Sequence, residues 1–424
     1  MLYLSVVVFT ACNMGYRPNV PSKVELKKNE HGQNRLFVNG EEFYVKGAGL
    51  EFGDIDLLGS SGANSFRTWR TENKQEDALE ILDKAHENNL MVLMGLEVGR
   101  ERHGFDYNDS IKIREQFEYL KGEVERLKNH PALLAWAIGN ELNLGAQNLK
   151  VYDAVNEISK MIHKIDPNHP TTTTMAGIGK REIDYIKVNC TDIDFISIQM
   201  YGDIVNLQKR IADAGWTGPY MVTEWGATGH WEVAKTPWDA AIEPNSNEKA
   251  KSFIERYNSA IEPDKINCLG SYVFLWGQKQ ERTPTWYGMF LENGNKTETV
   301  DAMYYLWNKK WPENRCPSID SFRLNNKTAF DNIKLKQGEV FNAQVFIQEY
   351  ENDPVSFKWE IMPESTDLGY GGDYESRPET LITIESGEIV SLRAPGKIGA
   401  YRLFVYVTDN SENSATANIP FYVQ

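Results

Sequence analysis

The chain has 424 residues, 41% of them apolar, and carries a formal net charge of −15 with a pI near 5.1. This length is too great for one small core and predicts two domains, or one large barrel with an accessory module. The negative charge argues against nucleic acid or an anionic membrane surface as the main partner, and it is compatible with a neutral substrate.

The N-terminal residues are typical of an export signal. Residues 2–12, LYLSVVVFTAC, form a short apolar run that resembles a bacterial lipoprotein signal cleaved before Cys12. We therefore expect a signal peptide over residues 1–12 ending at a lipidated Cys12, a tether over 13–22, and a periplasmic, outer-membrane or cell-surface location. The run is too short to span a bilayer, so the lipid would be the membrane attachment. An ordinary secretory signal and a misplaced start codon are the alternatives.

The chain then predicts a (β/α)8 barrel, an α/β fold. Residues 23–42 favour a β-hairpin, which we expect at the bottom of the barrel. Over residues 43–311, apolar runs typical of strands buried on both faces alternate with amphipathic helical patterns. A doubly wound sheet is the competing fold, but no glycine-rich phosphate loop follows the first strand. The expected strands are 43–49, 64–69, 91–98, 133–141, 171–178, 194–201, 220–227 and 270–277.

The pattern changes after residue 316. Residues 317–424 contain short alternating runs separated by Asn, Asp, Gly and Pro, which predict a C-terminal immunoglobulin-like β-sandwich. The three cysteines beyond Cys12 have no zinc-ligand spacing, so we expect no metal. We expect them to be buried thiols, two of which could form one disulfide that the sequence does not assign. A binding module, a spacer and a structural buttress all remain possible roles for the sandwich.

Two glutamates stand out at the ends of barrel strands. In AWAIGNEL (135–142) a buried strand runs into Gly139, Asn140 and Glu141, and MVTEWGA (221–227) places Glu224 at the end of the seventh strand. Barrel enzymes take their catalytic residues from this rim. Glycoside hydrolysis needs two carboxyl groups, about 5 Å apart in retaining enzymes, and strands four and seven lie nearly opposite each other. Other acidic residues are also expected at this rim, and their position alone makes them alternative catalytic candidates. They are Glu51, Asp54, Glu97, Glu101 and Asp203.

These two motifs resemble the clan-A retaining glycoside hydrolases, over residues 43–311. The resemblance implies that Glu141 is the acid/base and Glu224 the nucleophile, with no cofactor. It also implies that Asn140 holds the sugar 2-hydroxyl. We expect further substrate-site residues at Arg67 and Tyr201, which would keep Glu224 ionised, and at Trp276, which would form the floor of the subsite, with Trp225 and His103 as weaker candidates. Some of Trp231, Trp238 and Trp286, in the loops after strands seven and eight, should stack on sugar.

A barrel followed by an immunoglobulin-like domain most resembles bacterial endo-β-1,3-glucanases of glycoside hydrolase family 158. That resemblance implies a monomer acting on laminarin-type β-glucan. Families 5 and 2 are also similar. The jelly-roll domain that precedes many family 2 barrels has no counterpart here, which makes family 2 the less favoured of the two. A β-mannanase, an exo-β-glycosidase, a transglycosylase and a non-catalytic surface glycan-binding lipoprotein remain alternatives.

Overall fold

The structure is a computed structural model that describes residues 20–73 and 75–424. The expected signal peptide, Cys12 and most of the expected tether lie outside these residues. Within the described part of the chain, no helix combines the length and the apolar character needed to cross a membrane.

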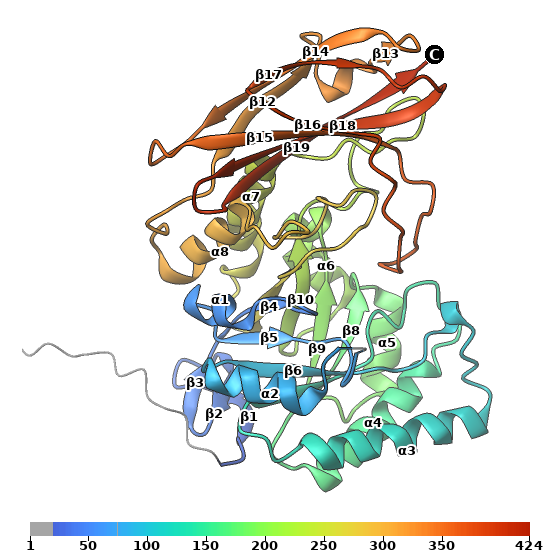
Figure 1. Ribbon diagram of the computed structural model, residues 1–424. Coiled ribbons are helices and arrows are strands. Elements are labelled where there is room, and N and C mark those ends of the chain that lie inside the picture. The colour runs from blue at the N-terminus through green and yellow to red at the C-terminus, as the bar shows by residue number, and fades with distance from the viewer. Residues whose placement is uncertain (1–19, 74) are drawn as a thin grey trace, which may run out of the picture.

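Eight parallel strands close into a barrel around which helices pack, as Figure 1 shows, so the predicted fold class is confirmed. The barrel order is β10-β11-β4-β5-β6-β7-β8-β9, which is chain order around a closed ring. Each strand coincides with one of the apolar runs, because a strand covered on both faces must be apolar along its whole length. The strands are β4 (Val45–Gly49), β5 (Ser65–Arg67), β6 (Met91–Leu96), β7 (Leu133–Ile138), β8 (Thr171–Ala176), β9 (Phe195–Gln199), β10 (Tyr220–Gly226) and β11 (Cys268–Phe274).

The helices bury one apolar stripe each against the barrel. In α4 the buried positions Val151, Val155, Ile158 and Ile162 follow the helical spacing that the sequence shows. Several helix starts carry side-chain caps; for example, Asp77 and Glu80 form a capping box at the start of α2. The helices are α1 (Ile55–Ser60), α2 (Ala78–Glu87), α3 (Ser110–Leu127), α4 (Val151–Ile165), α5 (Lys180–Asn189), α6 (Leu207–Ala214), α7 (Ser246–Arg256) and α8 (Glu298–Asn308).

A small antiparallel sheet covers the N-terminal ends of the barrel strands. It consists of β1 (Val24–Lys28), β2 (Asn34–Val38) and β3 (Glu41–Phe43), one strand more than the expected hairpin. The backbone N–H of Asn34 donates to the carbonyl of Ile266 just before β11, at 2.8 Å. This sheet therefore closes the barrel at the end opposite to the carboxyl ends of its strands.

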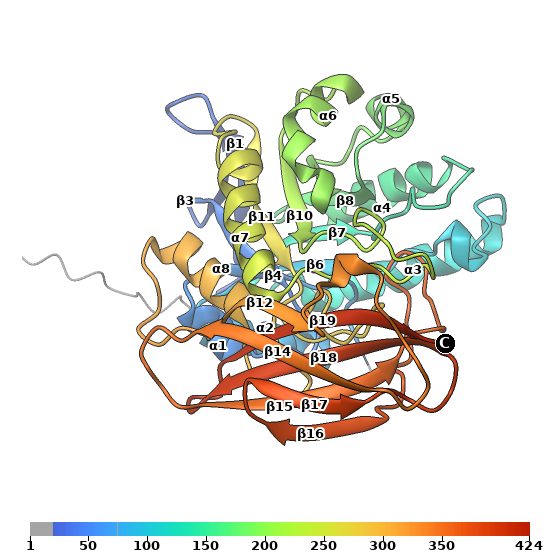
Figure 2. The ribbon, with the colours of Figure 1, turned by 90° about the horizontal axis from the view of Figure 1, so that it is seen from above.

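The C-terminal residues form two facing sheets with their own apolar core, which we call the sandwich. One sheet has the order β12-β14-β17 and the other β13-β19-β18-β15-β16. Trp359 and Phe421 are among the residues buried between the sheets. Figure 2 shows the sandwich packed beside α7 and α8. Its strands are β12 (Ser318–Leu324), β13 (Lys334–Leu335), β14 (Val340–Gln348), β15 (Val355–Pro363), β16 (Ile382–Ser386), β17 (Ile389–Arg393), β18 (Gly399–Asp409) and β19 (Ser414–Val423).

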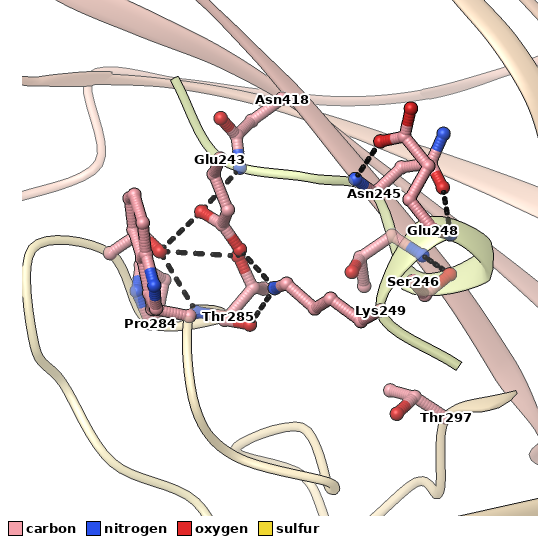
Figure 3. A network of polar contacts seen from close by, with 12 residues as sticks. Glu243, Asn245, Ser246, Glu248, Lys249, Pro284, Thr285, Thr297 and Asn418 are labelled. Atoms are coloured by element: carbon pink, nitrogen blue, oxygen red, sulfur yellow. Dashed lines mark hydrogen bonds and ion pairs between the residues drawn. The ribbon is translucent and has the colours of Figure 1, made fainter. Parts of the chain in front are cut away.

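A buried polar network joins the sandwich to the barrel (Figure 3). The carboxylate of Glu243, in the segment between β10 and α7, accepts from Lys249 Nζ at 2.5 Å and from Thr285 Oγ1 at 2.9 Å. On the sandwich side, Asn418 Nδ2 donates to the same carboxylate at 2.6 Å. Since buried charges must be paired and hydrogen-bonded, this network fixes how the two domains dock.

The three cysteines within the described residues are free and buried, so the disulfide that the sequence left room for does not form among them. Burial raises the pKa of the Cys190 thiol to about 12 and that of Cys268 to about 11. These thiols behave as small apolar core residues.

Candidate active site

The carboxyl ends of β5, β9 and β10 bring distant polar side chains together. Arg67 is the last residue of β5, Gln199 is the last residue of β9, and Glu224 lies in β10 and pairs in register with Gln199. All three side chains are buried. Because parallel strands end at the same rim, residues far apart in sequence meet there.

The carboxylate of Glu224 is surrounded by hydrogen-bond donors. Its Oε1 accepts from Arg67 Nη1 at 3.2 Å, and its Oε2 accepts from the Tyr201 hydroxyl at 2.9 Å. The sequence predicted both of these residues next to Glu224. It missed Trp69, whose Nε1 donates to Oε1 at 2.8 Å, and Gln199, whose Nε2 donates at 3.1 Å. Hydrogen bonds to the charged form and the guanidinium of Arg67 stabilise an ionised carboxylate here.

Tyr201 is held in its protonated form. Burial, followed by the charge of Glu224, raises the pKa of Tyr201 well above its ordinary value. The phenol therefore keeps its proton and acts as a donor to Glu224.

Asn140 shares two of these donors. Its Oδ1 accepts from Arg67 Nη2 at 2.8 Å and from Gln199 Nε2 at 2.7 Å, which fixes the orientation of the amide. Its Nδ2 donates to no other residue of the described chain, so that N–H2 group is free to donate to a ligand.

Glu141 lies just beyond the end of β7. The chain turns at Gly139 with φ +76°, and Glu141 itself has φ +51°, a left-handed conformation that is unfavourable for a residue with a side chain. The backbone N–H of Glu141 donates to the carbonyl of Thr174 at 3.1 Å, which holds the strained residue in place. This turn lifts the carboxyl group from the strand to the rim.

The environment of Glu141 favours its neutral form. Desolvation by burial, followed by the charge of Glu224, raises the pKa of Glu141 to about 8, against the opposing effect of Arg102, Arg100 and Arg67. At neutral pH the group is therefore protonated and can give up a proton. A carboxyl group with a raised pKa beside a carboxylate that is surrounded by hydrogen-bond donors is the arrangement that acid and nucleophile roles require. The roles of both glutamates stay predictions until they are tested.

Two of the predicted tryptophans do not reach the site. Trp276 is fully buried, donates its Nε1 to the carbonyl of Asp54, and packs on Phe290 and Trp307. The expected floor at Trp276 is therefore wrong, because β11 ends at Phe274 and the chain has turned away before Trp276. Trp225 is also fully buried. It points out of the barrel and packs on α7, since it alternates with the inward-facing Glu224.

Phe274, the last residue of β11, lies beside the residues that bind Glu224. Its ring lies edge-on to Trp69 at 5.8 Å and to Tyr201 at 6.0 Å between centroids, and both of these residues bind Glu224. An aromatic ring in this position can form the floor under a sugar bound at Glu224.

His103 and the loop tryptophans lie farther from Glu224. His103 is exposed, and its Nε2 lies 3.1 Å from the carboxylate of Asp373 in the sandwich, so its imidazole takes part in the domain contact. Trp231 is 58% exposed and lies edge-on to Tyr201, whereas Trp286 is buried. Trp238 is half-buried and packs on Tyr422 of the sandwich, so of these loop tryptophans it is Trp231 that lies open beside the site.

Three carboxylates in the sandwich lie close enough together to hold a metal ion. Oxygen atoms of Glu349, Asp353 and Asp409 lie within 4.8 Å of one another. The Asp409 carboxylate already accepts from Asn413 Nδ2 and from the backbone N–H of Ser411. Acidic side chains commonly meet at a surface without an ion, so this cluster by itself does not define a metal site.

Comparison with known proteins agrees with this geometry. The family described as "Glycosyl hydrolases family 2, TIM barrel domain" matches residues 44–277. A β-glucuronidase from Paenibacillus borealis is 26% identical over 300 residues, which cover 62% of this chain and 47% of that protein. A β-glucuronidase from Homo sapiens is 21% identical over 283 residues, covering 60% of this chain and 41% of that protein. The chain thus spans less than half the length of these curated relatives.

Among solved structures, the β-glucuronidase of Bifidobacterium dentium in complex with coumarin-3-O-glucuronide superposes with a TM-score of 0.51 at 18% identity. The match covers 68% of this chain and 49% of that one, which supports the same fold. The family match over the barrel supports family 2, one of the similar families that the sequence indicates. The chain belongs to the glycosyl hydrolase family 2 TIM-barrel domain family.

Proposed function

We propose that the protein is a retaining β-glycosidase that cleaves its substrate by double displacement, with Glu224 as nucleophile and Glu141 as acid/base. The observation that supports this most is the contrast between the two carboxyl groups. Glu224 accepts charge-stabilising hydrogen bonds, including those from Arg67 and Trp69, while burial raises the pKa of Glu141 to about 8. Glu141 is thus protonated at neutral pH, as an acid must be, and the donors around Glu224 hold its carboxylate as a nucleophile must be held.

In the first step Glu224 attacks the anomeric carbon. A bond forms between its carboxylate oxygen and that carbon while the glycosidic C–O bond breaks, and the proton of Glu141 moves to the leaving oxygen. In the second step Glu141, now ionised, takes a proton from a water molecule that attacks the same carbon, and Glu224 leaves. Asn140 Nδ2 would donate to the sugar 2-hydroxyl in both steps.

For the substrate we propose laminarin-type β-1,3-glucan, cleaved within the chain. The support is the resemblance of barrel and sandwich together to family 158, and a neutral glucan suits the acidic surface of the protein. The location at the cell surface through a lipidated Cys12 belongs to the same proposal. A polysaccharide is too large to enter a cell, so its hydrolase must work outside.

A β-glucuronide is the second candidate substrate. The two curated relatives described above are named β-glucuronidases. Arg100 lies near Glu141 and forms no salt bridge with another side chain of the described residues. Burial and the neighbouring Arg102 lower the pKa of Arg100, so an anionic substituent on the substrate would stabilise this charge.

Hydrolysis of a panel of substrates tests the proposal. Laminarin, curdlan, lichenan, mannan, cellulose and 4-nitrophenyl β-D-glucuronide are incubated with the protein, and the products are resolved by chain length. We expect oligosaccharide release from laminarin, and retained configuration in the first-formed anomer by proton NMR. Inversion would contradict the nucleophile role of Glu224, and turnover of the glucuronide without turnover of any glucan would select the second candidate.

Glu141→Gln and Glu224→Gln should each abolish product release from laminarin. The matched control is Glu97→Gln, since Glu97 is an exposed acid after β6 on the same rim and should leave activity unchanged. If both active-site variants still bind laminarin and release product at the wild-type rate, the protein is not an enzyme of this type. Binding by the wild type without any product release would favour the non-catalytic glycan-binding protein.

A further inference from the structure

One loop of the sandwich reaches the rim of the barrel. Residues 364–381 connect β15 to β16, and in Figure 1 this loop descends in red-orange from the sandwich toward the barrel. It is bound on two separated sides of the rim. Arg102, in the β6–α3 segment, donates to the carbonyl of Tyr370 at 2.6 Å, and Lys279, after β11, donates to the carbonyl of Gly372 at 2.8 Å.

Partly buried ion pairs hold both ends of the loop in this position. At its start Glu364 binds Arg402, whose Nε donates at 2.9 Å, and Arg402 also donates to the carbonyl of Ala241 in the barrel domain. On its returning limb the buried carboxylate of Glu375 accepts from Arg282 Nη1 at 2.7 Å. The Glu243 network of Figure 3 fixes the docking of the two domains beneath it. The sandwich is thus part of the barrel rim and not a module on a swinging linker.

The tip of the loop packs on the turn that carries Glu141. The backbone N–H of Leu144 donates to the carbonyl of Glu141, so residues 141–144 form one turn. Gly371 lies against it with φ +61°, and a Cβ at this position would collide with Leu144 and Arg102. The positive φ favours glycine here, and a larger residue would also have to displace the side-chain ends of Leu144 and Arg102.

Tyr370 is the side chain that this docking places beside the turn. Its ring edge lies next to Gly145, where an added Cβ would stand 3.7 Å from Cε1, and the guanidinium of Arg102 lies 5.9 Å from its centroid. The ring is nevertheless 60% exposed. An aromatic side chain that is fixed through its own backbone and left open to solvent beside the acid/base can be a preformed binding surface.

We propose that Tyr370 of the sandwich is a substrate-binding residue that stacks on the sugar unit on the leaving-group side of the cleaved bond. We assign Tyr370 to the leaving-group side because the acid must lie next to the leaving oxygen. Glu141 is the proposed acid, and Tyr370 lies beside the turn that begins with Glu141. The inference deepens the proposed function and depends on it. It gives the sandwich a direct part in substrate recognition.

The test compares two substrates that differ in their leaving group. Laminaripentaose presents sugar units on the leaving-group side, whereas β-laminaribiosyl fluoride presents a single atom there. Tyr370→Ala should lower kcat/KM for laminaripentaose about tenfold and leave that for the fluoride unchanged, which corresponds to the loss of one aromatic contact. Tyr370→Phe keeps the ring and should behave like the wild type.

Tyr374→Ala is the matched control, because Tyr374 lies on the same loop, is 85% exposed and should leave both substrates unaffected. If Tyr370→Ala cleaves laminaripentaose like the wild type, or loses activity equally on both substrates, the stacking role is wrong while the proposed function stands. If the wild type hydrolyses neither substrate, the β-glucanase function fails and the stacking role fails with it.

Discussion

The indole N–H of Trp69 donates to Oε1 of Glu224 over 2.8 Å, a shorter contact than those made to this oxygen by Arg67 and Gln199. Trp69 follows β5 and Glu224 lies in β10, so the contact crosses the barrel. The ring of Trp69 also packs edge-on against Phe274. One residue thus both orients the proposed nucleophile and supports the proposed floor of the sugar site.

Trp69→Phe should lower kcat about ten- to a hundredfold with little change in stability. The substitution keeps most of the ring and removes one hydrogen bond to a charged group, a contribution of about 1.5–3 kcal/mol. Trp216→Phe is the control, because the Trp216 indole donates to the carbonyl of Pro219 instead. Steady-state hydrolysis of laminarin measures the effect. Equal rates for the two variants would show that this hydrogen bond does not support catalysis.

The pH dependence should report the proton of Glu141. Its pKa of about 8 means that the acid form is present below that pH and is lost above it, so kcat/KM for laminarin should fall on the alkaline side near pH 8. Arg100→Gln removes a positive charge that stabilises the carboxylate form, so the pKa rises and the alkaline limb moves to higher pH.

Arg114→Gln is the control for this shift, since Arg114 is exposed on α3, away from the rim. Its pH profile should superpose on that of the wild type. An alkaline limb that stays in place, or that moves to lower pH, in Arg100→Gln would show that the limb does not report Glu141.

The sequence predicted the barrel and the two glutamates because both rest on local patterns. Apolar runs locate strands buried on both faces, and a carboxylate at the end of such a run is visible without knowing its neighbours. Trp69 and Gln199 were missed because their role comes from convergence on Glu224, which only the closed barrel creates. Gln199 did give a signal, since an amide inside the apolar run DFISIQMY needs a buried partner.

Trp276 was misplaced for a different reason. The strand was expected to run to residue 277 but ends at Phe274, and a small error at a strand end changes which side chain points into the barrel. The contact of Tyr370 with the turn after Glu141 could not be predicted from the sequence, because it joins segments more than 200 residues apart through the docking of two domains. Pattern along the chain carries no information on such docking.

Phe274→Ala and Trp276→Phe should separate the two candidate floors. Phe274→Ala removes the ring that packs on Trp69 and Tyr201, so kcat/KM for laminarin should fall at least tenfold. Trp276→Phe should keep near-wild-type kcat/KM and lower the thermal midpoint, because Trp276 fills the core beside Trp307. The reverse pattern, with activity lost in Trp276→Phe alone, would restore Trp276 as the floor.

Lys249→Met should destabilise the protein by about 3 kcal/mol, since it leaves the carboxylate of Glu243 buried without its cation. Adding Glu243→Gln removes the unpaired charge, so the double variant should regain part of this loss. Lys251→Met, at an exposed position of α7, is the control. Urea unfolding followed by tryptophan fluorescence gives the free energies. If Lys249→Met matches Lys251→Met, the buried ion pair does not hold the sandwich on the barrel.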